Sequence, residues 1–192
     1  MTQGRVLSLT DPQDHMLSVE WTASEGWLQP RITPYQNFSL DPATSVLHYA
    51  FTAFEGSKAY RDKNGDIRLF RPDKNMARMN RSVARIALPT FEGDKMIELI
   101  AKFTKMEERF VPSARGYSLY LRPTMIGTQR TLGVGPPGSA LFFCIASPVG
   151  PYYPTGFKAI SLEATTSPCE LGQEVLGMQS LVPTTHLVSY HR

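Results

Sequence analysis

The amino-acid sequence predicts an α+β fold for its first 150 residues. Strand-like runs come first, two helical segments follow between residues 72 and 110, and further strand-like runs begin at residue 117. Strands and helices that are grouped in this way, rather than alternating, are typical of the α+β class. The 42% hydrophobic and 10% aromatic content of the 192 residues suits a packed core.

Composition and charge argue against several function classes. The net charge of +3 is spread over interleaved acidic and basic residues, so we expect no nucleic-acid binding. No apolar run approaches the roughly 18 residues that cross a membrane, and Cys144 and Cys169 show no metal-ligand spacing. We therefore expect no membrane insertion and no metal. Acidic residues outnumber the single arginine in the first 25 positions, which is untypical of a mitochondrial presequence, so we expect a cytoplasmic location.

The amino-terminal part of the chain reads as strands and extended segments. Residues 15–21 (HMLSVEW) predict a strand, and residues 29–42, rich in proline and polar residues, are expected to be extended. Residues 62–65 (DKNG) separate the runs 56–61 and 66–70. Because an Asn-Gly pair tolerates positive φ, this arrangement predicts a β-hairpin. The expected apolar anchors of the first strand are Met16, Val19 and Trp21.

Two helices follow the hairpin. Pro72 suits a first helical turn, where a missing N–H costs nothing, and apolar residues then recur at helical spacing as far as Ala87. The second helix is predicted from about Asp94 to Phe110. The expected inward residues are Met76, Met79, Val83 and Ile86 on the first helix, and Met96, Ile97, Ile100, Phe103 and Met106 on the second.

Three further strands are predicted at residues 117–127, 139–148 and 157–164, with a loop at residues 133–138. The Pro- and Tyr-rich segment 150–156 is the best candidate for a domain boundary. Within the run SLYLRP, a period of two places Tyr120 and Arg122 on one strand face and the leucines on the other. A hydroxyl and a guanidinium thus lie side by side, as a binding pair or as an ordinary solvated face. Cys144, in the apolar run LFFCIA, is expected to be a buried and inert thiol.

Three segments together carry a resemblance to a known family: HYAFTAFEGSKAY (residues 48–60), RLFRPDKNMARM (68–79) and SLYLRP (118–123). The chain resembles the branched-chain amino acid aminotransferases, pyridoxal 5'-phosphate enzymes of fold type IV, from about Asp14 to Ala164. The resemblance implies the small amino-terminal domain of that fold and only the start of the second domain. It also implies a homodimer, a cytoplasmic or mitochondrial location, and amino transfer between leucine, isoleucine or valine and a 2-oxo acid, 2-oxoglutarate.

The resemblance implies roles for individual residues. It assigns Arg78 to the cofactor phosphate, which a guanidinium can bind bidentately. It assigns Tyr49 and Phe54 to the substrate pocket, Tyr120 and Arg122 to the neighbourhood of the substrate carboxylate, and Val134 to a loop that reaches the partner subunit's site. Without the resemblance, the residues favour a surface arginine at Arg78 and two core aromatic residues at Tyr49 and Phe54.

The cofactor-binding lysine of the family has no counterpart in this chain, so no residue is assigned as catalytic. Lys58 lies inside a diagnostic motif, but the family's lysine lies elsewhere. Synonymous codons for residues 165–192 can be chosen so that a shifted reading frame, starting at the third base of each codon, encodes DFAVRAWPGGSGDAKFGANYAPCIVPQ. This second sequence has the pattern expected of the family. We therefore expect a small domain at 1–150, a linker and first strand of the second domain at 151–165, and an out-of-frame tail at 166–192.

Three functional hypotheses follow. The first is a branched-chain aminotransferase by ancestry that is truncated and inactive as written. The second is a non-catalytic partner of an intact paralogue, acting through the dimer surface of the family. The third is another fold type IV enzyme, a D-amino acid aminotransferase or an aminodeoxychorismate lyase.

Overall fold

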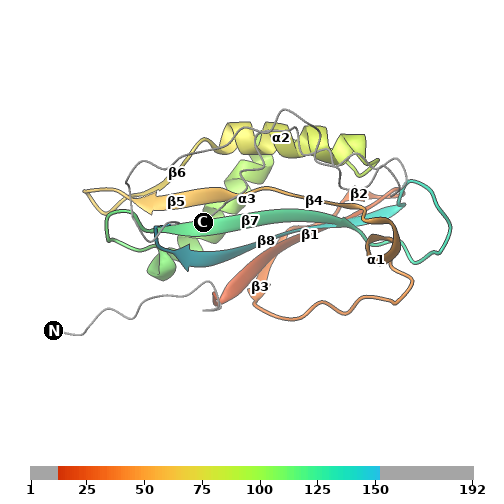
Figure 1. Cartoon of the computed structure of the whole chain (residues 1–192), viewed down its shortest axis with the longest axis horizontal. Coiled ribbons are helices and arrows are strands. Elements are labelled where there is room, and N and C mark those ends of the chain that lie inside the picture. The colour runs from red at the N-terminus through yellow and green to blue at the C-terminus, as the bar shows by residue number, and fades with distance from the viewer. Residues whose placement is uncertain (1–12, 152–192) are drawn as a thin grey trace, which may run out of the picture. The chain divides into compact units, whose positions relative to one another are not determined.

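The computed structural model describes residues 13–151, which lie in the first of two units of the chain, Met1–Tyr152. They form a single antiparallel sheet with the strand order β2-β1-β8-β7-β5-β6, to which β3 adds by pairing with β1 and β4 by pairing with β7 (Figure 1). The strands are β1 (His15–Thr22), β2 (Gly26–Trp27), β3 (Arg31–Pro34), β4 (Thr52–Phe54), β5 (Ser57–Arg61), β6 (Ile67–Leu69), β7 (Ser118–Gly127) and β8 (Ser139–Val149). The α+β prediction is confirmed.

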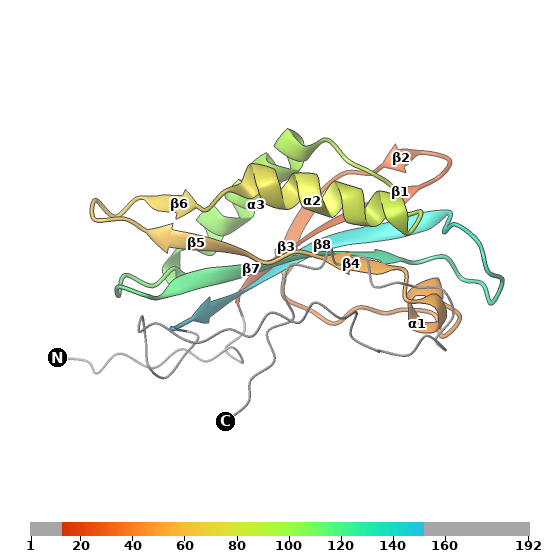
Figure 2. The same ribbon diagram turned by 45° about the horizontal axis from the view of Figure 1, so that its top comes forward.

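Helices α2 (Pro72–Arg85) and α3 (Gly93–Met106) lie on one side of this sheet, as Figure 2 shows. The segment that joins β3 to the short helix α1 (Ser45–Tyr49) runs on the opposite side, where Phe38 packs edge-on against Phe143 of β8 at 4.9 Å between ring centroids. The sheet therefore has a helix side and an open side. No helix among residues 13–151 is long and apolar enough to cross a membrane.

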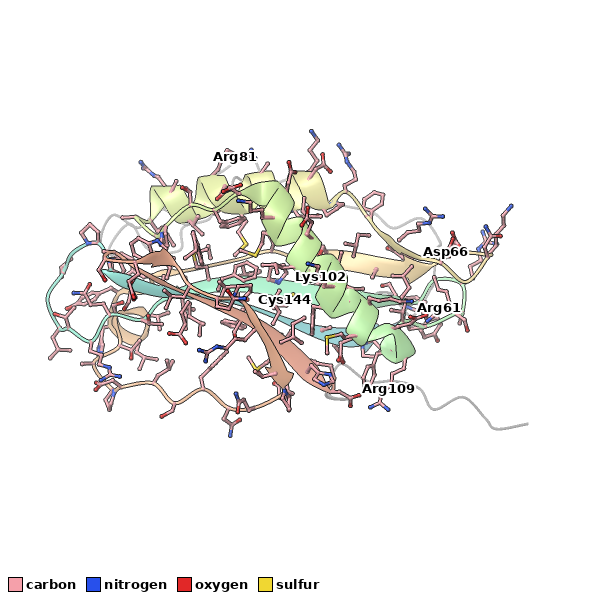
Figure 3. All side chains as sticks on the ribbon, turned by 180° about the vertical axis from the view of Figure 1, so that it is seen from behind. Arg61, Asp66, Arg81, Lys102, Arg109 and Cys144 are labelled. Atoms are coloured by element: carbon pink, nitrogen blue, oxygen red, sulfur yellow. The ribbon has the colours of Figure 1, made fainter. Side chains whose placement is uncertain are left out.

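The core lies between the sheet and the two helices. Alternate residues of β7 and β8 face the helices, and Leu119, Leu121, Phe142 and Cys144 are completely buried there. Figure 3 shows Cys144 in this layer and Arg81 on the outer side of α2. Complete burial in apolar surroundings raises the pKa of the Cys144 thiol above its ordinary value, so the expectation of a buried thiol is confirmed. The helices contribute Met76, Met79, Val83, Met96, Ile100 and Phe103.

The helix predictions are largely confirmed, with one error. Helix α2 begins at Pro72 as expected, and the second predicted helix ends at Met106, followed by a short 3₁₀ turn at Glu108–Phe110. Met106 was expected inside but is 51% exposed, whereas Glu107 is completely buried. The Glu107 carboxylate accepts hydrogen bonds from the backbone N–H of Asp14 (2.9 Å) and from Nδ1 of His15 (2.7 Å). A buried polar group that is paired in this way can take a core position.

The hairpin prediction is confirmed by the antiparallel pairing of β5 with β6. Gly65 has a φ of 89°, and the side chain of Asp62 accepts backbone N–H groups of Asn64 and Asp66 at 2.9 and 3.0 Å. Asp62 thus organises the turn together with the Asn-Gly pair. No local pattern had indicated the short elements α1, β2 and β4. The predicted strand at 157–164, the linker after Pro151 and the tail at 166–192 lie outside the described residues.

Candidate functional site

A two-residue interruption in the sheet organises the candidate site. Strands β5 and β4 both pair with the same edge of β7. The register Ser57↔Leu121 continues as Phe54↔Thr124 without an inserted residue. Pro123 lies within the interruption and lacks the N–H that the ladder needs, although its carbonyl still accepts the N–H of Glu55 at 2.9 Å. We call residues Glu55 and Gly56 the β4–β5 junction.

On the open side of the sheet, three of the predicted site residues meet beside this junction. The Arg122 guanidinium lies 4.5 Å from the ring centroid of Phe54 and 5.2 Å from that of Tyr120. Its Nε and Nη2 donate to the Tyr120 hydroxyl at 3.1 and 2.8 Å. Phe54 is 58% exposed, so its other face remains available to a ligand. The period-2 prediction for Tyr120 and Arg122 is confirmed.

On the helix side, Glu55 binds Arg78 of α2. The carboxylate is 5% exposed and accepts Nε and Nη2 of Arg78, each at 2.6 Å. Asn75, one helical turn before Arg78, donates to the same carboxylate at 3.0 Å and to the Gly56 carbonyl at 3.2 Å. The hydrogen bonds to Glu55 raise the pKa of Arg78 above its ordinary value, so this guanidinium stays charged.

Gly56 is required by its close approach to Tyr120. A Cβ built at Gly56 would lie 3.0 Å from Cζ and 3.1 Å from Cε2 of the Tyr120 ring, and closer still to the hydroxyl. Carbon atoms in good contact are about 3.5–4.0 Å apart. Any side chain at this position would therefore displace the Tyr120 hydroxyl from Arg122.

Among the described residues, Tyr49 binds the loop that carries Val134 and not the β4–β5 junction. Tyr49 ends α1 and donates its hydroxyl to the carbonyl of Leu132, in the loop between β7 and β8. The same loop carries Val134, which is 81% exposed. The Tyr49 hydroxyl thus fixes the loop that presents Val134. His48 donates Nε2–H to the Pro42 carbonyl at 2.8 Å, in keeping with a structural role.

Lys58 borders this site, because it pairs with Tyr120 across the ladder and is exposed on the same open side. A hollow of about 880 Å³ lies on the open side near β1 and β3, and its lining includes Glu20, Arg31 and Arg130. None of the predicted site residues lines it.

Asp14, His15 and Glu107 each place a potential metal-ligand atom within 4.8 Å of the others. Both oxygens of Glu107 already accept hydrogen bonds from the other two residues, and Arg109 pairs with Asp14. These contacts link the start of β1 to the end of α3.

Three residues of the candidate site were not predicted from the sequence. Glu55 and Gly56 stand in the FEG motif that identified Phe54, and Asn75 stands three positions before Arg78. The helical spacing of Asn75 and Arg78 places them on one helix face, which was an available signal. Nothing in the sequence indicated that their common partner is a buried carboxylate 20 positions or more away.

The chain is similar in sequence to curated aminotransferases, although no protein-family model matches it. The mitochondrial branched-chain-amino-acid aminotransferase of Saccharomyces cerevisiae is 60% identical over 152 residues, which cover 79% of this chain and 39% of that protein. The cytosolic enzyme of the same yeast is 58% identical over 152 residues, which cover 79% of this chain and 40% of that protein. The chain thus spans about 40% of the length of these relatives.

Solved structures show the same fold. The branched-chain amino acid aminotransferase of Escherichia coli matches with a TM-score of 0.56 at 21% identity, over 73% of this chain and 41% of that one. The enzyme of the archaeon Thermoproteus uzoniensis, solved with norvaline, matches with a TM-score of 0.55 at 20% identity, over 70% of this chain and 41% of that one. At this identity the two structures establish the likeness of fold, and the sequence relatives establish the kinship. This chain belongs to the branched-chain amino acid aminotransferase family.

Proposed function

We propose that residues 13–151 act as the small domain of a branched-chain amino acid aminotransferase, with Arg78 binding the phosphate of pyridoxal 5'-phosphate. The observation that carries this proposal is the pairing of Arg78 with the buried carboxylate of Glu55 at the β4–β5 junction, whose open side carries the cluster of Phe54, Tyr120 and Arg122. One edge of the Arg78 guanidinium is occupied by Glu55, whereas Nη1 makes no hydrogen bond with any residue between 13 and 151. The side chain is 44% exposed, so this donor set fits a phosphate group.

The open side of the sheet supplies the substrate contacts. A fixed guanidinium and a tyrosine hydroxyl suit a carboxylate, and Arg122 and Tyr120 provide them side by side. The exposed ring of Phe54 suits the aliphatic side chain of leucine, isoleucine or valine, with 2-oxo acids as the amino acceptors. Tyr49 holds the loop of Val134, which in a homodimer would serve the partner subunit's pocket.

Pyridoxal 5'-phosphate, when bound, acts as the electron sink of amino transfer. The reaction also needs a lysine that carries the proton, and no lysine of this sequence stands in the family's motif for it. We therefore propose that these 192 residues bind cofactor phosphate and substrate groups without completing amino transfer. We also propose a domain boundary at residue 150, a linker and first strand at 151–165, an out-of-frame tail at 166–192, and a cytoplasmic location.

A second candidate function is that of a non-catalytic partner of an intact paralogue. The observation that favours it is the exposure of apolar side chains on α1 and on the loop between β7 and β8, where Leu47, Leu132 and Val134 are 60%, 66% and 81% exposed. Co-purification of the tagged chain with an active aminotransferase subunit would support this candidate. A monomer that recovers no such subunit would count against it.

The first test is a binding titration of the 192-residue chain with pyridoxamine 5'-phosphate, and with pyridoxamine as the phosphate-free control. Pyridoxamine has no aldehyde, so lysines do not react with it. We expect tighter binding of the phosphate form, and an Arg78→Ala variant should lose tenfold or more of that preference, because a hydrogen bond to a charged group contributes about 1.5–3 kcal/mol. Arg81→Ala, on the outer side of α2, is the matched control. Equal binding of the two ligands by the unsubstituted chain would refute the assignment of Arg78.

A further inference from the structure

The buried carboxylate of Glu55 binds Arg78 more extensively than is needed to pack α2 against the sheet. Helix α2 already buries Met76, Met79 and Val83 almost completely in the core. Removing a carboxylate from water is costly unless it is fully paired, and replacing such a pair by apolar residues is often neutral or stabilising. The pairing of Glu55 with Arg78 is therefore not explained by stability alone.

The contacts of Glu55 fix it from several directions. Its side chain binds Nε and Nη2 of Arg78 at 2.6 Å and the amide of Asn75 at 3.0 Å. Its backbone N–H binds the Pro123 carbonyl at 2.9 Å, which ties it to β7. Arg78, by contrast, is 44% exposed, and it would have several rotatable bonds free without this partner. Glu55, which is fixed by these contacts, thus orients the flexible side chain of Arg78.

We propose that Glu55 is a positioning residue that, with Asn75, holds the Arg78 guanidinium so that its Nη1 edge is preorganised for a phosphate group. This inference rests on the proposed function, which assigns Arg78 to phosphate. A bidentate contact defines both the position and the plane of the guanidinium. Ordering before binding lowers the entropy that the ligand has to overcome, and an arginine side chain carries about 2 kcal/mol of rotamer entropy.

If Glu55 acted only through its charge, removing that charge would change phosphate affinity in the opposite direction. A carboxylate close to the site repels a phosphate dianion, so its neutralisation without loss of positioning would tighten phosphate binding. The same holds if Glu55 merely competes with phosphate for Arg78. The direction of change on removing the charge therefore separates positioning from repulsion or competition.

The experiment is a titration with pyridoxamine 5'-phosphate of five forms of the 192-residue chain: unsubstituted, Glu55→Gln, Glu55→Asp, Arg78→Ala, and the double variant Arg78→Ala with Glu55→Gln. We expect about tenfold weaker binding for Glu55→Gln, a change equivalent to about 1.4 kcal/mol. Glu55→Asp keeps the charge but is too short for the bidentate contact, so it should also weaken binding. In the Arg78→Ala background, Glu55→Gln should have no further effect, because Glu55 acts through Arg78.

A structural readout accompanies the titration. The Nε–H proton resonance of Arg78 reports its hydrogen bond to Glu55, and it should move in both Glu55 variants while the cooperative unfolding transition is retained. If Glu55→Gln binds equally or more tightly while Arg78→Ala loses binding, the positioning role is wrong and the proposed function stands. If the unsubstituted chain does not prefer the phosphate form, or Arg78→Ala has no effect, the proposed function itself fails and the inference fails with it.

Discussion

Substitution of Gly56 by alanine should damage the site through a single steric contact. The added Cβ would lie 3.0 and 3.1 Å from two ring carbons of Tyr120, several tenths of an ångström inside good contact. The ring must move away, and its hydroxyl then leaves the Nε and Nη2 donors of Arg122, now at 3.1 and 2.8 Å. Overpacking of this kind costs about 1–3 kcal/mol.

We expect the lower half of that range, about 1–2 kcal/mol, because the site is partly exposed and the Tyr120 ring is only half-buried. For a domain of this size, this corresponds to a decrease in Tm of roughly 2–8 °C. The assay is thermal and urea unfolding of the 192-residue chain, compared with Gly93→Ala. Gly93 is the first residue of α3, and a Cβ there meets Met76 at an ordinary 3.8 Å. The control should be unchanged or slightly more stable, since alanine favours helix.

A double-mutant cycle isolates the contact. The atom nearest the new Cβ is the Tyr120 hydroxyl. In a Tyr120→Phe background, Gly56→Ala should therefore cost measurably less than in the unsubstituted chain. If the cost is the same in both backgrounds, or if Gly56→Ala behaves like Gly93→Ala, the steric argument is refuted.

Three further predictions concern other parts of the described structure. In a Cys169→Ser background, iodoacetamide at about pH 8 should label Cys144 only after denaturation, because burial raises the pKa of its thiol and shields it; full labelling of the folded chain would contradict this. Desolvation is the largest influence on Asp62 and raises its pKa, but hydrogen bonds from Arg68 and from the turn backbone together hold that pKa below 3.8. Stability from Asp62 is therefore present above this pH and is lost as the pH falls, so Asp62→Asn should flatten the decline of the unfolding free energy between about pH 5 and pH 3. Val134→Asp should change the unfolding free energy by no more than about 0.5 kcal/mol, because Val134 is 81% exposed, yet it should weaken any self-association seen by sedimentation.

Local patterns in the sequence were sufficient for most of the fold. The 3.6-residue recurrence of Met76, Met79 and Val83 located α2, and the alternation in SLYLRP separated Tyr120 and Arg122 from the buried leucines. The start of α2 was predicted to the residue because Pro72 favours the first helical turn. These features were predictable because helix and strand periods act over a few neighbouring residues.

The error at Met106 shows where local pattern fails. Periodicity placed this apolar residue inside, but the helix ends at Met106 and the next residue, Glu107, enters the core. Glu107 can do so only because Asp14 and His15, more than 90 positions earlier, supply hydrogen bonds. A distant pairing of this kind outweighs the local preference of an acidic residue for solvent.

Local patterns and motifs in the sequence were enough to predict the class of fold, the main helices and strands, the family resemblance and most of the candidate site residues. Which of these candidate residues meet becomes visible only in the folded arrangement. Phe54, Tyr120 and Arg122 gather on the open side of the sheet, and Arg78 is held by Glu55 on the helix side. Tyr49 instead binds Leu132, in the loop that carries Val134. The contacts of Arg78 with Glu55 and of Tyr49 with Leu132 join residues 23 and 83 positions apart, so they form only through strand pairing and core packing and not through any local period.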